Sequence, residues 1–180
     1  MAAMYFIQRH PLEDLLPSQP PEPGADHLTV LLRPTVFSAF ATQAESDGLR
    51  TLQGVSARSC SPLEWLLISE DLGAQALGRS LNTAGLRWVD QSHAYVVVRL
   101  RGPNARAILA KGVGADLHPS VFAVGQSANA LCGQVQVNLA CVGEDTFELA
   151  MMRSYASFAF QDLMLGGKEF ALTAAFEGRS

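Results

Sequence analysis

The chain has 180 residues, of which 48% are hydrophobic and 17% are charged, and its formal net charge is −4. This length allows one large domain or two small ones, with enough apolar residues for a sizeable core. The weakly acidic balance argues against nucleic acid as a partner, because such proteins carry a basic stripe. The low charge also indicates that part of the surface is buried against other subunits.

The sequence shows no pattern typical of a targeting signal, a membrane span or a cysteine motif. The N-terminus lacks the pattern of a signal peptide, and no apolar run approaches the ~20 residues that span a bilayer. The three cysteines, Cys60, Cys132 and Cys141, form no zinc-binding or disulfide pattern. We therefore predict a soluble cytoplasmic protein with no membrane partner.

Residues 1–27 are predicted to form an extended, proline-rich arm. Its prolines exclude regular structure over most of that length; they are Pro11, Pro17, Pro20, Pro21 and Pro23. Its apolar residues are too numerous for a free tail; they are Tyr5, Phe6, Ile7, Leu12, Leu15 and Leu16. The arm either drapes over a partner subunit or packs on its own domain, and the sequence does not decide between the two.

Residues 28–180 are predicted to form one α+β domain. Its first part is expected to contain a short strand at 28–32, a helix at 36–44, a buried strand at 65–68 and a helix at 72–83. Residues 52–60 fit neither pattern. Ser69 or Asp71 is placed to cap the helix at 72–83, and Gly85 to close it.

The local signals agree best between Val89 and Leu117. The β-branched run at 95–100 predicts a strand, which Gly102 and Pro103 end. Good helix formers follow at 105–111, and Gly112 stands where a C-terminal cap is expected.

Two alternating segments and a helix are predicted near the C-terminus. A strand is expected at 127–131 and another at 134–139, with Val135, Val137 and Leu139 inward and the amide side chains outward. A third strand is expected at 146–151, then a helix at 155–165 capped by Ser154. A last strand is possible at 170–173.

The strand–helix order of residues 62–83 is echoed after residue 144. The echo predicts two β-α-β-type halves, about 28–88 and 89–180, packed as one mixed or antiparallel sheet under helices.

Motifs for catalysis, metal binding and phosphate binding are not found. There is no nucleophile elbow, and the glycine pairs at 112–114 and 166–167 lack the spacing of a dinucleotide or phosphate loop. The four histidines are scattered, whereas a metal site needs two of them on one face or a carboxylate close by. We therefore predict no catalytic residue and no metal ligand.

Three residues remain as weak candidates for binding a folate or an anion. Asp90 lies at a strand end beside Ser92, where it would contact a ligand or accept backbone N–H bonds in its turn. Arg99 and Arg101 share one face of a strand and, with Arg106, make the only basic cluster. They would bind an anion or a carboxylate-bearing ligand, or pair with carboxylates of a neighbouring subunit.

Several motifs resemble one known family. They are Val89-Asp90-Gln91-Ser92, the strand ending in Gly102-Pro103-Asn104-Ala105-Arg106, Leu109-Ala110-Lys111-Gly112, Asp116-Leu117-His118-Pro119, Ser61 to Ile68, Asp145 to Leu149 and Arg153 to Ala156. Over about residues 50–165 the chain is similar to the gamma subunits of heterotetrameric sarcosine oxidases. The Asp-x-Ser, strand, Gly-Pro-x-Ala part resembles folate-binding aminomethyltransferase domains more widely. Gln91 and Val113-Gly114 depart from the family pattern.

The resemblance implies a fold like the folate-binding domain of aminomethyltransferases. It also implies a place beside alpha, beta and delta subunits in a complex that oxidatively demethylates sarcosine and passes the methyl carbon to folate. FAD, FMN, NAD, tetrahydrofolate and zinc are then expected on the partner subunits, and no cofactor or catalytic residue on this chain. Its expected role is to brace the folate-side alpha subunit.

Two other functions stay open at this point. The chain would be a free-standing folate-binding transferase or carrier, or a gamma subunit of a related complex that acts on another N-methylated amine.

Overall fold

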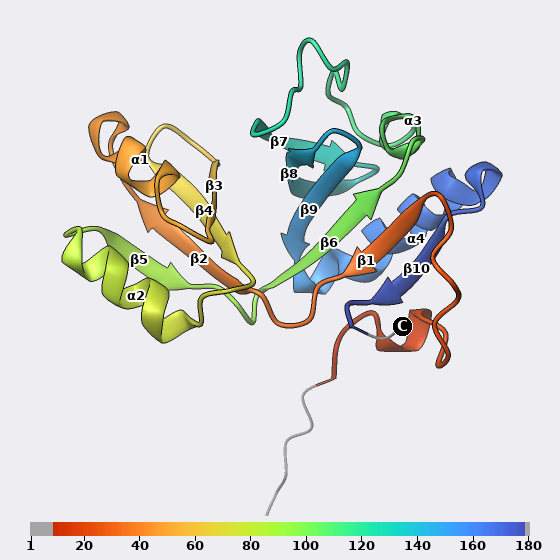
Figure 1. The fold of residues 1–180 in the computed structure, drawn as a ribbon, viewed down its shortest axis with the longest axis horizontal. Coiled ribbons are helices and arrows are strands. Elements are labelled where there is room, and N and C mark those ends of the chain that lie inside the picture. The colour runs from red at the N-terminus through yellow and green to blue at the C-terminus, as the bar shows by residue number, and fades with distance from the viewer. Residues whose placement is uncertain (1–8, 179–180) are drawn as a thin grey trace, which may run out of the picture.

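Two β-sheets pack against each other in the computed structural model, which describes residues 9–178, and helices cover their outer faces (Figure 1). The larger sheet has the strand order β10 (Thr173–Phe176), β1 (His27–Val30), β6 (Tyr95–Arg101), β9 (Thr146–Met152), β8 (Val135–Gly143) and β7 (Ser127–Cys132). The smaller sheet has the order β3 (Ser56–Ser59), β4 (Glu64–Ser69), β2 (Thr35–Phe40) and β5 (Arg87–Asp90). Only the β1–β10 pairing is parallel, so the predicted mixed α+β fold is confirmed.

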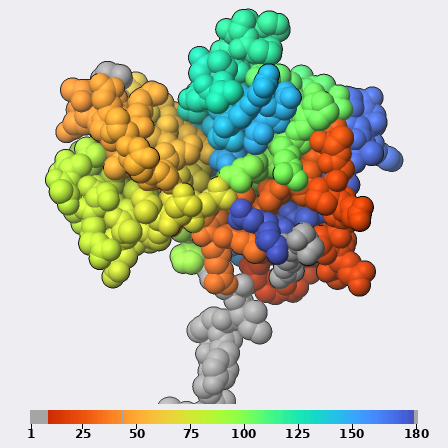
Figure 2. Space-filling model, in the orientation of Figure 1, coloured from red at the N-terminus to blue at the C-terminus, as the bar shows by residue number. Residues whose placement is uncertain are grey.

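Each sheet has its own helices. Helices α1 (Gln43–Arg50) and α2 (Ala74–Thr83) pack on the smaller sheet, where Leu49, Leu77 and Leu81 meet Phe37 and Trp65 in one cluster. Helices α3 (Ala105–Ala110) and α4 (Ala156–Gly167) pack on the larger sheet. Short 3₁₀ turns lie at Glu13–Leu15, Arg153–Tyr155 and Lys168–Phe170. In Figure 2 the smaller sheet and its helices form a lobe of their own, coloured orange to yellow-green.

A third apolar cluster joins the two sheets. Val36, Leu66 and Ile68 of the smaller sheet pack there against Val97 and Ala150 of the larger one. In β6, Val96, Val98 and Leu100 face the helices instead, as the period of a strand requires. The larger sheet is therefore covered on both faces, and polar side chains of its strands that face the smaller sheet need partners there.

The prediction of a single sheet layer was wrong. Residues 35–90 form their own sheet, whereas β1 joins the larger sheet and pairs with β6 and β10. The sheets therefore do not follow the predicted halves at 28–88 and 89–180.

The predicted helix at 36–44 was also wrong. Residues 35–40 form β2, the strand that pairs with both β4 and β5, and the helix begins only at Gln43. Because both edges of β2 carry a ladder, tertiary pairing decides the conformation of this segment. Residues 56–59, which fitted no pattern, form the edge strand β3.

Three smaller predictions near the C-terminus were wrong. Asn138 is not turned outward but buried, because the second sheet covers its face of β8. Ser154 does not cap α4; it lies in the 3₁₀ turn before it. The last strand begins at Thr173, and Phe170 ends a 3₁₀ turn.

The described part of the arm packs on its own domain. Leu12 has no exposed surface and belongs to the main core, with Leu16 packed against it. The Arg153 guanidinium donates to the carbonyl oxygen of Arg9. The predicted contacts of Tyr5, Phe6 and Ile7 lie outside the described residues.

Candidate functional site

Asp90 is held inside its own turn. It ends β5, and its Oδ1 accepts hydrogen bonds from the backbone N–H of Ser92 at 2.9 Å and from the Ser92 hydroxyl at 2.6 Å. The same hydroxyl oxygen accepts a hydrogen bond from the backbone N–H of Val36 at 3.0 Å. The carboxylate therefore organises the connection between β5 and β6 and secures it to β2.

A pocket of about 350 Å³ adjoins this turn. Its lining includes Asp90 and Glu13 together with the cationic side chains of Arg33 and Arg153. The arm closes one side of it through Arg9 and His10. Burial and the charge of Arg153 lower the pKa of His10 to about 4.

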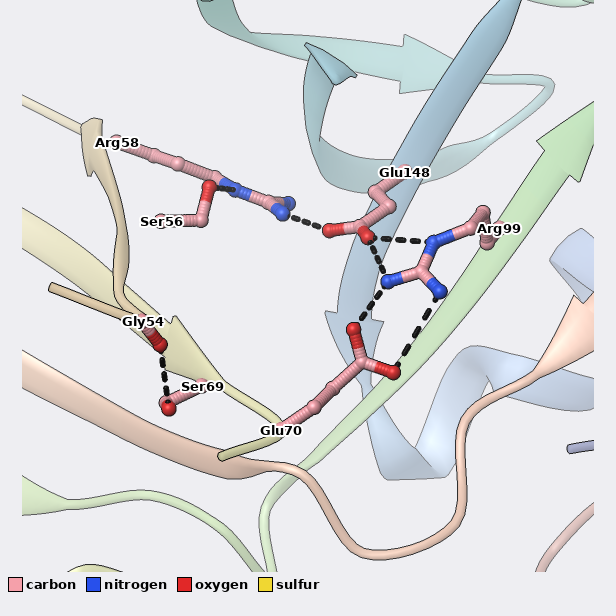
Figure 3. A network of polar contacts seen from close by, with 7 residues as sticks. All are labelled: Gly54, Ser56, Arg58, Ser69, Glu70, Arg99 and Glu148. Atoms are coloured by element: carbon pink, nitrogen blue, oxygen red, sulfur yellow. Dashed lines mark hydrogen bonds and ion pairs between the residues drawn. The ribbon is translucent and has the colours of Figure 1, made fainter. Parts of the chain in front are cut away.

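Arg99 lies in an ion network between the sheets (Figure 3). Its Nε and Nη2 donate to Oε1 of Glu148 at 2.8 and 2.5 Å, and its guanidinium also pairs with the carboxylate of Glu70. Burial lowers the pKa of Arg99, but the hydrogen bonds and charges of the two carboxylates outweigh it and raise the pKa. The carboxylates that Arg99 contacts belong to this same chain, and not to a ligand or a neighbouring subunit as the sequence had suggested.

Arg58 completes the network from the smaller sheet. Its guanidinium pairs with Oε2 of Glu148, and its Nε donates to Ser56 Oγ at 3.0 Å. Only 1% of the Arg58 side chain is exposed, and burial lowers its pKa although Glu148 opposes that effect. Within residues 9–178, Nη1 of Arg58 has no hydrogen-bond partner. Glu148 is thus shared between two arginines from opposite sheets.

The other end of the network is a pair of carboxyl groups. Glu177 follows β10, and burial and the hydrogen bond and charge of Glu70 raise its pKa. The pKa of Glu70 is lowered, because its hydrogen bonds to Arg99 and Glu177 outweigh its partial burial. The network therefore links the smaller sheet, the larger sheet and the C-terminal segment.

Arg101 and Arg106 are not part of this network. Arg101 is exposed at the end of β6, opposite His27 of β1. Arg106 lies in the first turn of α3, donates to the carbonyl oxygens of Leu117 at 2.5 Å and Phe122 at 3.1 Å, and lies 4.8 Å over the Phe147 ring. The three arginines of the predicted basic cluster therefore have three different environments.

Sequence reasoning missed Arg58, Glu148 and Glu70. Glu148 alternates with the core residues Phe147 and Leu149, a pattern that is typical of a strand with one face in water. Nothing in the local sequence indicated that a second sheet would cover this face. The one available signal was a glutamate inside the apolar strand that contains Glu148.

Helix α4 exposes large apolar side chains on its outer side. Its inner face is buried through Ala159, Phe160 and Leu163. Its outer face exposes 64% of Phe158 and 72% of Leu165, and Tyr155 precedes it with 56% exposed. Gln161 and Asp162 are also exposed on this face, but its large uncovered apolar side chains make it the strongest candidate for a subunit contact.

The described chain has three free thiols and no grouped set of metal ligands. Across residues 9–178 no group of three or more His, Cys, Asp or Glu side chains is arranged to hold a metal ion. Cys60, Cys132 and Cys141 are free thiols, and burial raises the pKa of Cys132 to about 11. None of the helices in this part of the chain is both long and apolar enough to cross a membrane.

A family model describes the chain over most of its length. The model of the sarcosine oxidase, gamma subunit family matches residues 47–167, which contain β3 to β9 and all of α2 to α4. No curated protein matches the chain.

Two solved structures share the fold. A chain of the heterotetrameric sarcosine oxidase from Corynebacterium sp. U-96 is 21% identical, with a TM-score of 0.77 over 91% of this chain and 96% of that one. The glycine cleavage system aminomethyltransferase T from Bartonella henselae is 16% identical, with a TM-score of 0.59 over 83% of this chain. The match covers 47% of the aminomethyltransferase, so this chain corresponds to about half of that protein. The predicted likeness to an aminomethyltransferase fold is confirmed.

Proposed function

The chain belongs to the sarcosine oxidase gamma subunit family, and from this membership we propose that it is a non-catalytic subunit of a heterotetrameric sarcosine oxidase. The family match over residues 47–167 carries the proposal. In the complex, sarcosine is oxidatively demethylated and the methyl carbon passes to folate. The catalytic groups, the flavins, NAD, tetrahydrofolate and zinc belong to the alpha, beta and delta subunits.

The part assigned to this chain is to brace the alpha subunit. The outer face of α4, with Tyr155, Phe158 and Leu165, supplies the apolar centre of that contact. Aromatic anchors at the centre of an interface contribute most of its binding energy. The ion network of Arg58, Glu148 and Arg99 holds the two sheets together behind this face, so that a rigid surface is presented.

The test is a co-purification with a matched pair of variants. The tagged chain is expressed with its partner subunits, and the eluate is examined for larger chains and for flavin absorbance. Phe158→Glu is expected to reduce the recovered flavin by at least about tenfold, because it places a charge at the centre of an apolar contact. Leu63→Glu, in an exposed turn before β4, is the control and is expected to leave the recovery unchanged.

A chain that elutes alone and colourless would overturn the proposal. Recovery of flavin with both variants would keep the complex but remove α4 from its interface. A related complex that acts on another N-methylated amine would be recognised by the substrate that reduces the recovered flavin.

A further inference from the structure

A second pocket, of about 310 Å³, opens between the two sheets at the other end of β4 from Glu70. Both sheets line it, with Ser38, Cys60 and Glu64 on one side and Tyr95, Asn138 and Met152 on the other. It is separate from the pocket beside Asp90, although Tyr95 lines both. The interior of the fold therefore has a polar end that neither the ion network nor the apolar cluster between the sheets fills.

Asn138 gives this pocket an unused hydrogen-bond acceptor. Its Nδ2 donates to Asn129 Oδ1 at 2.9 Å, and Asn129 Nδ2 donates in turn to the carbonyl oxygen of Cys60 at 2.8 Å. This chain of bonds fixes which way both amides point. Only 5% of Asn138 is exposed, and its Oδ1 has no partner among residues 9–178. A buried acceptor in this state is costly unless a donor reaches it.

The pocket has one charged side chain, and it is negative. Glu64 is the only charged residue of the lining, which contains no lysine, arginine or histidine. The charge of Glu64 acts on its neighbours in the pocket. The pKa of the Cys60 thiol is raised first by burial and then by the Glu64 carboxylate. The pKa of Tyr95 is raised by burial and by both of these neighbours. The polar lining thus combines neutral hydroxyl, thiol and amide groups with one negative charge and no positive one.

We propose that this inter-sheet pocket binds a small alkylammonium cation. The ammonium N–H groups would donate to Asn138 Oδ1 and to the Glu64 carboxylate, and Tyr95, which lines the same space, would bring an aromatic ring near the positive charge. Leu66, Ala150 and Met152 supply an apolar wall for the alkyl groups. A carboxylate on the ligand is disfavoured, because no cation of the lining would pair with it. This assignment goes beyond the bracing role and does not depend on it.

The pocket has a reporter in its own wall. Met152 lines the pocket, whereas its neighbour Met151 points into the core on the other face of β9. The full chain, in whatever assembly it purifies, is labelled with ¹³C at its methionine methyl groups, and Met152→Leu identifies the Met152 signal. The probe is dimethylammonium chloride, with sodium chloride at equal ionic strength and isopropanol as a neutral molecule of similar size.

Binding is expected to move the Met152 signal and leave the Met151 signal in place, with a Kd of about 1 mM, as is ordinary for a ligand of so few atoms. Glu64→Gln keeps the shape of the side chain and removes its charge, and we expect about tenfold weaker binding. Glu144→Gln, in the turn between β8 and β9, is the control and should bind as the wild type does.

Three results would overturn the assignment. The first is a Met152 signal that does not move at dimethylammonium concentrations on the order of 100 mM, far above that expected Kd. In that case a bound water molecule would supply the hydrogen bond to Asn138 Oδ1. The second is an equal shift with isopropanol, which would indicate an unselective apolar site. The third is unchanged binding in Glu64→Gln. Loss of flavin from the purified complex would bear only on the proposed function, so the two failures are distinguishable.

Discussion

Arg58 of β3 and Glu148 of β9 form an ion pair that joins the two sheets, although the two residues are 90 positions apart in the chain. Both side chains are almost completely buried. A buried ion pair contributes little net free energy compared with apolar residues, but removing one partner leaves an uncompensated charge.

Glu148→Gln is therefore expected to lower the free energy of unfolding by about 3–5 kcal/mol, because Arg58 and Arg99 both lose their shared carboxylate. Urea unfolding followed by tryptophan fluorescence measures the change. Glu169→Gln removes the partner of Lys111 on the surface, and its cost should stay below about 1 kcal/mol. Equal costs for the two variants would show that the buried network does not hold the sheets together.

His10 makes stability dependent on pH. In the folded chain its pKa is lowered to about 4, first by burial and then by Arg153, and its Nδ1 accepts a hydrogen bond from the backbone N–H of Leu12. The unfolded chain binds a proton there near the ordinary pKa of 6.5. Since the unfolded state binds more protons between these two values, the stability from His10 is complete above pH 6.5 and is lost as the pH falls towards 4.

His10→Asn keeps an acceptor for Leu12 and removes the titration. We expect the free energy of unfolding of this variant to vary less with pH between 6.5 and about 4 than that of the wild type. Urea titrations at several pH values test this. An identical slope in both proteins would mean that other groups determine the acid sensitivity.

Gly102 is required by a close approach of two segments. Its φ is +132°, and a Cβ at this position would lie 2.3 Å from the carbonyl oxygen of Ala25 and 2.4 Å from Asp26 Oδ1. Gly102→Ala should therefore cost roughly 3 kcal/mol or more of stability. Gly48 lies in α1 with nothing near its missing Cβ, and Gly48→Ala is expected to stabilise the chain by up to about 1 kcal/mol. Thermal melts of both variants check the pair, and a destabilised Gly48→Ala would contradict the helix assignment.

Asp90 is expected to act on stability rather than on folate. Asp90→Ala should cost about 1 kcal/mol by removing two hydrogen bonds within the turn, whereas Asp90→Asn keeps the Oδ1 acceptor and should be nearly neutral. Calorimetric titration of the wild type with tetrahydrofolate decides the alternative function. Heat that disappears in Asp90→Ala, at unchanged stability, would assign the folate-binding role to this chain.

Local patterns predicted the elements that local signals determine. The strand at 95–100 and the helix that follows Gly102 and Pro103 were placed correctly, because β-branched residues, a proline and helix formers agree there. The segment 36–44 failed because its apolar spacing also fits a helix, and only the pairing of β2 with β4 and β5 decides otherwise.

The candidate site was less accessible to sequence reasoning. Asp90 and Arg99 were found, but the partners of Arg99 come from residues 70 and 148, which no local pattern connects. Asn138 was predicted to face the solvent, because one face of an antiparallel sheet is usually exposed to water. A second sheet packs on that face in the folded protein, and it buries the polar residue that the alternating pattern had assigned to the surface.

The pairing of β1 with β10 has a consequence for how the protein is made. β1 at residues 27–30 has β6 on one side and β10, residues 173–176, on the other. The ladder between β1 and β10 is therefore among the longest-range contacts of the chain, and such contacts slow folding. It can form only after residues 173–176 have been synthesised, long after β1, so the larger sheet is completed late. Until then one edge of β1 is exposed, and a chaperone or a partner subunit has that interval in which to protect it.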